Sequence, residues 1–115
     1  MIDPLRPSNR HLLYTAGPIR GDQDRNVERA RDLAIELRTA GWSVFCPHLN
    51  SVDIPGIGGL DAYLAEDFEV LARCDALVLL PNWQKSEGSL REIEFASMRG
   101  IPILDWRALL PDGRA

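Results

Sequence analysis

Short runs of apolar residues alternate along the chain with longer segments whose apolar residues recur every three or four positions. The short runs predict four β-strands, over residues 11–16, 42–46, 75–80 and 101–104. The longer segments predict three helices, over about residues 24–40, 60–73 and 89–99. Strands that alternate with helices are typical of an α/β domain with a parallel sheet.

The third predicted strand is continuously apolar (DALVLL), which is typical of a strand covered on both faces. We therefore expect a single flavodoxin-like or Rossmann-like three-layer α/β domain, with a four- to five-stranded parallel sheet in the order 2-1-3-4. Such sheets bind ligands outside the carboxyl ends of the strands where the strand order reverses. The candidate chemistry should therefore follow Ala16 and Leu80.

Residues 1–10 contain two prolines and no hydrophobic period, so we predict a flexible lead-in of 1–10 and one domain over 11–115. Residues 47–59 are rich in Gly and Pro and predict a long surface loop. The tail after residue 104 is expected to add at most one helical turn.

Composition and charge exclude several classes of protein. The 115 residues carry a formal net charge of -4, the wrong sign for a protein that wraps a nucleic-acid polymer. We find no apolar run long enough for a membrane span and no signal peptide, and we expect a cytoplasmic protein. Cys46 and Cys74 are interpreted as buried free thiols, and neither a metal nor an organic cofactor is implied.

The segment after the first strand reads YTAGPIRG. Gly17 allows the backbone to approach a ligand closely, and Arg20 offers a planar cation for a phosphate or carboxylate. The spacing is not the GxGxxG fingerprint, which disfavours a nicotinamide dinucleotide. The structural alternative is a tight turn with a solvated arginine.

The segment after the third strand contains Ser86, Gly88 and Ser89 before a predicted helix. Either serine could cap that helix, and the first N–H groups of the helix would form an anion site. Glu92 follows Ser89 at the spacing of a capping box, so one interpretation gives Glu92 a purely structural role at the start of the helix. Alternatively Glu92 lies in the first turn, is kept ionised by the helix dipole, and attacks an electropositive carbon.

Asp67 falls in the apolar stripe of the second predicted helix, where a carboxylate is costly without a partner. Two carboxylates are the minimum for splitting a bond to an anomeric carbon through a covalent intermediate. Tyr14 could orient the nucleophile, although a tyrosine at the edge of the core is commoner. His11 and His48 are interpreted as structural, and Trp83 could stack on a base or cover the core.

Three segments, YTAGPIRG, DFEVLARCDALVLLP and WQKSEGSLRE, together resemble the nucleoside 2-deoxyribosyltransferase-like family, which includes 2'-deoxynucleoside 5'-phosphate N-hydrolases. The resemblance implies that Glu92 is the nucleophile, with Asp67 and Tyr14 in the catalytic positions. Ser86 and Arg20 resemble the nucleotide hydrolases and favour a 5'-monophosphate. Pro18 departs from the serine of that group.

The resemblance implies an enzyme that cleaves the N-glycosidic bond of a nucleoside or its 5'-monophosphate and passes the sugar to water or to another base. The substrate-binding residues would be Gly17, Arg20, Ser86, Gly88 and Ser89. The alternative is a noncatalytic module that senses nucleotides. Because four strands and one loop hardly close over a nucleotide, we expect a homodimer or higher homo-oligomer.

Overall fold

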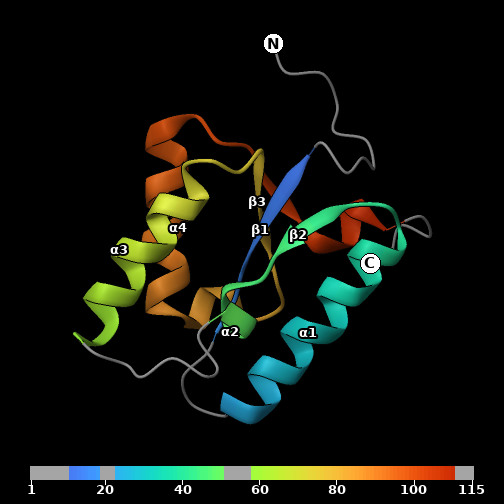
Figure 1. Ribbon diagram of the computed structural model, residues 1–115, viewed down its shortest axis with the longest axis horizontal. Coiled ribbons are helices and arrows are strands. Elements are labelled where there is room, and N and C mark those ends of the chain that lie inside the picture. Colours follow the sequence, from blue (N-terminus) through green and yellow to red (C-terminus); the bar gives the residue numbers. More distant parts are fainter. Residues whose placement is uncertain (1–10, 19–22, 51–57, 111–115) are drawn as a thin grey trace.

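The computed structural model describes residues 11–18, 23–50 and 58–110. These residues form four strands, four α-helices and two short 3₁₀ helices, arranged as Figure 1 shows. In chain order the elements are β1 (Leu12–Ala16), α1 (Gln23–Thr39), β2 (Ser43–Phe45), α2 (Pro47–Asn50), α3 (Gly59–Leu71), β3 (Ala76–Leu79), η1 (Trp83–Lys85), α4 (Glu87–Arg99), β4 (Ile103–Asp105) and η2 (Trp106–Leu109).

All four strands are parallel, and their order is β2-β1-β3-β4. This confirms the order predicted from the sequence. β1 lies between β2 and β3, so Tyr14 is aligned with Phe45 on one side and Leu77 on the other. The strand order reverses between β1 and β3, which makes the carboxyl ends of these two strands the expected ligand edge.

Helices cover both faces of the sheet and make the domain three layers thick, as predicted: α1 packs on one face, and α3 and α4 pack on the other (Figure 1). Successive residues of a strand point to opposite faces. Leu13 accordingly belongs to the cluster that includes Leu37 of α1, whereas Tyr14 packs with Leu71 and Ala96 on the face of α3 and α4. The register of β1 therefore directs Tyr14 toward those two helices.

Two sequence predictions about local structure were wrong. The segment 47–59 was expected to be a loop, but it begins with the helical turn α2, which has proline at the favoured first position. The last helix begins at Glu87 rather than Ser89, because Ser86 is its N-cap. The predicted lead-in 1–10 lies outside the described residues.

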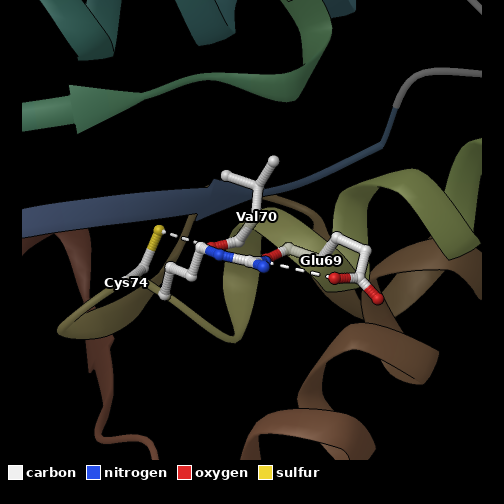
Figure 2. Close-up of polar contacts among 4 residues, drawn as sticks. Glu69, Val70 and Cys74 are labelled. Atoms are coloured by element: carbon white, nitrogen blue, oxygen red, sulfur yellow. Dashed lines mark hydrogen bonds and ion pairs between the residues drawn. The ribbon is translucent and has the colours of Figure 1, made fainter.

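The end of α3 is fastened by local contacts before the chain enters β3. The Cys74 thiol donates to the Val70 carbonyl at 3.3 Å, and Arg73 pairs with the Glu69 carboxylate at 3.1 Å (Figure 2). Both cysteines are free and buried, as expected from the sequence. Among the helices of the described residues, none is long and apolar enough to cross a membrane.

Candidate active site

Tyr14 is the centre of a buried polar cluster between the sheet and helices α3 and α4. Its side chain is fully buried, and its ring stacks on that of Phe45 with 5.8 Å between centroids. Its hydroxyl donates a hydrogen bond to Oε2 of Glu92. A residue on a central strand is thereby joined to a helix 78 positions away in sequence.

Glu92 is placed by the start of α4. The Ser86 hydroxyl accepts a hydrogen bond from the Ser89 amide at 3.1 Å, which makes Ser86 the N-cap. The proposed capping box of Ser89 and Glu92 is therefore wrong, and Glu92 falls in the second turn instead of the first. Its side chain is only 6% exposed and faces the sheet.

Asp67 enters the same cluster from α3. Its side chain is 9% exposed, so the carboxylate in the apolar stripe is buried. Burial raises the pKa of Asp67, and burial together with the charge of Asp67 raises the pKa values of Glu92 and of the Tyr14 hydroxyl. The structure thus brings Tyr14, Asp67 and Glu92 together from three separate elements.

Burial dominates the protonation of this cluster. It raises the pKa of Glu92 to about 8, against the hydrogen bond from Tyr14, which favours the ionised form. Burial also raises the pKa of Asp67, to about 6, and that of the Tyr14 hydroxyl, which stays protonated and able to donate. The helix dipole was expected to keep Glu92 ionised in the first turn of α4; Glu92 lies in the second turn, where the dipole acts more weakly, and burial favours its protonated form.

Four of the five predicted substrate-binding residues lie within the described residues, directly after β1 or at the start of α4. Gly17 follows β1, and a Cβ on it would come within 3.0 Å of the Leu80 Cβ. The glycine is thus required for the close packing of two strand ends. Gly88 has room for a Cβ, which would meet Leu64 and Ser86 at ordinary contact distances. Arg20 lies outside the described residues.

Ser89 differs from the other polar residues of the site. It is 1% exposed, and its Oγ has no hydrogen-bond partner among the described residues. An unpaired buried hydroxyl costs stability, so such groups in native proteins call for an explanation. Ser89 precedes Glu92 by about one helical turn, which puts both side chains on neighbouring parts of one face.

His48, interpreted from the sequence as structural, is 4% exposed and lies on α2. Its Nε2 donates to the Pro18 carbonyl at 3.0 Å, and burial lowers its pKa. Trp83 is partly exposed in η1. In the described part of the chain, no group of three or more His, Cys, Asp or Glu residues could hold a metal ion.

Comparisons with known proteins agree with this architecture. Residues 11–105 match the model of the family described as "Domain of unknown function (DUF4406)". No curated protein matches the chain. The fold is similar to that of the 2-deoxyribosyltransferase from Bacillus psychrosaccharolyticus, with a TM-score of 0.59, 21% identity, and coverage of 82% of this chain and 70% of that one.

A conserved protein from Enterococcus faecalis V583 has the same fold, with a TM-score of 0.68 and 22% identity. The match covers 83% of this chain and 62% of that protein, so this chain spans less than two thirds of its length. At these identities the two structures establish the shared fold. The family match covers most of the chain, and the protein therefore belongs to the DUF4406 family.

Proposed function

We propose that the protein cleaves the N-glycosidic bond of a nucleoside, or of its 5'-monophosphate, through a covalent glycosyl intermediate on Glu92. The observation that carries this proposal is the buried cluster of Tyr14, Asp67 and Glu92, in which the Tyr14 hydroxyl donates to Glu92 and the charge of Asp67 acts on both. Paired carboxylates are the chemistry required for a glycosyl–enzyme mechanism. The similarity in fold to a 2-deoxyribosyltransferase supports the same class of substrate.

In the first step a carboxylate oxygen of Glu92 attacks the anomeric carbon. The carbon–nitrogen bond breaks, and its electron pair leaves with the base, which takes a proton from Asp67. The Tyr14 hydroxyl holds Oε2 of Glu92, which leaves the other oxygen for attack. The sugar is then esterified to Glu92 and the base is free to leave.

In the second step water, or a nitrogen of a second base, attacks the same carbon from the face that the first base left. Asp67, now ionised, accepts the proton of the attacking group, and the ester oxygen returns to Glu92 as a carboxylate. Water gives an N-hydrolase, and a second base gives a deoxyribosyltransferase. No metal or organic cofactor takes part in either step.

The protonation of Glu92 and Asp67 determines which form of the protein can react. With pKa values of about 8 for Glu92 and about 6 for Asp67, the pair holds one proton near neutral pH. That proton rests mainly on Glu92, whereas attack requires it on Asp67. Substrate binding and the Tyr14 hydrogen bond must therefore favour the ionised form of Glu92. Because the state with one proton is most populated between the two pKa values, the rate should be highest near pH 7 and fall on either side.

The start of α4 suits the sugar or phosphate oxygens. Gly88 and Ser89 contribute the first turn, Ser86 caps it, and the macrodipole favours an anion there. Gly17, directly after β1, and Arg20, which lies outside the described residues, complete the proposed set. The protein would act as a homodimer or higher homo-oligomer, in which a neighbouring subunit closes over the nucleotide.

A noncatalytic nucleotide-sensing module is the second candidate, and the raised pKa of Glu92 favours it, because a protonated carboxyl is a poor nucleophile. Incubation with each deoxynucleoside, ribonucleoside and their 5'-monophosphates, with and without acceptor bases, distinguishes the two candidates. The proposal predicts release of free base by the wild-type protein and a loss of release in Glu92→Gln. Binding without release across all substrates and acceptors would instead support the sensing module.

A further inference from the structure

We infer that His48 is a positioning residue for the proposed reaction: its imidazole holds the main chain where β1 ends, and so sets the wall against which the substrate binds. This inference rests on the proposed function for its substrate. The sequence analysis interpreted His48 as a structural residue. It lies on the helical turn α2, which the sequence pattern did not predict.

The main chain leaves the sheet directly after Ala16. The last ladder contact is the Leu80 amide, which donates to the Ala16 carbonyl at 2.9 Å, and Gly17 then packs tightly against Leu80. The next residue, Pro18, has no N–H and can be fastened through its main chain only by its carbonyl. His48 supplies the donor for that carbonyl, at 3.0 Å and across 30 positions of sequence.

The environment of His48 fixes which nitrogen donates. A carbonyl accepts only from a protonated nitrogen, so Nε2 carries the hydrogen, and Nδ1 faces the Cys46 sulfur at 4.0 Å. Cys46 is 8% exposed and free, so its thiol can donate weakly to Nδ1 and favour this tautomer. The imidazole is therefore an oriented neutral donor with its ring enclosed.

The held segment borders a hollow at the ligand edge of the sheet. The hollow lies on the α1 side of the sheet, where Gly17, Pro18 and His48 line it with Leu80 and Pro81, which follow β3, and with four residues of α1, Asn26, Arg29, Ala30 and Leu33. Since α/β folds bind ligands where the strand order reverses, a shift of Pro18 moves one wall of the proposed site. Glu92 and Asp67 lie on the other side of β1, among α3 and α4, so the chemical groups keep their own hydrogen bonds when His48 changes.

The test uses His48→Leu, which removes the donor at similar size, and His48→Gln, whose amide can replace Nε2. Trp42→Phe is the matched control, because Trp42 is equally buried at 4% and donates its Nε1 to the Leu109 carbonyl at 3.1 Å, in the cluster on the α1 face. All three variants and the wild type are compared for KM and kcat on a deoxynucleoside 5'-monophosphate. Deuterium uptake of peptides that contain Gly17 is followed in parallel.

For His48→Leu we expect KM to rise about tenfold, because binding must then restore the position of the displaced Pro18 segment at a cost of about one buried hydrogen bond, with kcat within about twofold of the wild type. Deuterium uptake around Gly17 should increase. His48→Gln should restore both, and Trp42→Phe should lose thermal stability without changing either.

Equal KM values in His48→Leu and Trp42→Phe, or unchanged uptake around Gly17 in His48→Leu, would overturn the inference. The uptake measurement requires no turnover. A wild-type protein that releases no base would therefore contradict the proposed function, while uptake would still decide whether His48 holds this segment.

Discussion

The raised pKa of Glu92 predicts a specific dependence of stability on pH that needs no substrate to test. Glu92 is 6% exposed, and its pKa rises from 4.5 to about 8 on folding. The folded state therefore keeps a proton that the unfolded chain releases above pH 4.5. This contribution to stability is full below pH 4.5 and is lost as the pH rises through 8.

The full shift from 4.5 to about 8 corresponds to about 5 kcal/mol, and about 2 kcal/mol of it should be lost between pH 6.5 and 8.5. That window lies above the pKa of Asp67, which burial raises only to about 6. It also lies above the lowered pKa of His48 in the folded protein. The loss is a large fraction of the stability of an ordinary domain.

Urea unfolding of wild type and Glu92→Gln at pH 6.5, 7.5 and 8.5 measures the effect as a difference in slope. The wild type should lose about 2 kcal/mol more than the variant across this range, because Gln has no proton to release. The unfolded-state titration of His48 is common to both proteins and cancels in the difference. Parallel pH profiles for the two proteins would refute the assignment of a buried, protonated Glu92.

Three further predictions concern the neighbours of Glu92. Tyr14→Phe removes a hydrogen bond to the ionised Glu92, worth roughly 1.5–3 kcal/mol, and should move the upper pH midpoint of kcat/KM upward by about one to two units; an unchanged upper midpoint would contradict the role of Tyr14. Asp67→Asn should lower base release by about 10²–10⁴-fold, and less for a leaving group that needs no proton; equal losses for both substrates would exclude Asp67 as the acid. Ser86→Ala should lower the stability by about 1 kcal/mol, because the N-cap of α4 is lost, and circular dichroism should show a lower Tm. Ser86→Asp keeps a capping side chain and should keep the wild-type Tm. Equal Tm values in the wild type and both variants would contradict the assignment of Ser86 as the N-cap.

The sheet could be predicted from the sequence because its strands are distinct in pattern. The continuously apolar run that became β3 is covered on both faces, and its neighbours on either side follow from the alternation of strands and helices. Leu13 and Tyr14 are successive residues of β1 and therefore point to opposite faces of the sheet, Leu13 toward α1 and Tyr14 toward α3 and α4. These features are local in sequence and periodic.

The start of α4 could not be predicted with the same accuracy. Ser86 and Ser89 are both cap-forming residues, and Ser89 is followed by a glutamate at capping-box spacing, so the sequence pattern fits two starts. Tertiary packing decides between them. With Ser86 as the cap, Glu92 comes to face Tyr14 instead of the main chain of its own helix.

The protonation state of Glu92 could not be predicted from the sequence for a related reason. The dipole of α4 was predicted from position alone, but desolvation depends on what α3 and β1 place around Glu92. The placement of Asp67 was more accessible, since a carboxylate within an apolar stripe already indicates burial. α2 was missed because one turn is too short for a hydrophobic period to develop.

The central claim is that Glu92 becomes covalently bound to the sugar, and one measurement tests it directly. Wild-type protein is mixed with a deoxynucleoside 5'-monophosphate, quenched in acid during turnover, digested and analysed by mass spectrometry. The account predicts that the peptide containing Glu92 gains the mass of the deoxyribosyl phosphate, and that Glu92→Gln shows no such gain. Release of free base by both proteins at equal rates, with no added mass on that peptide, would contradict it.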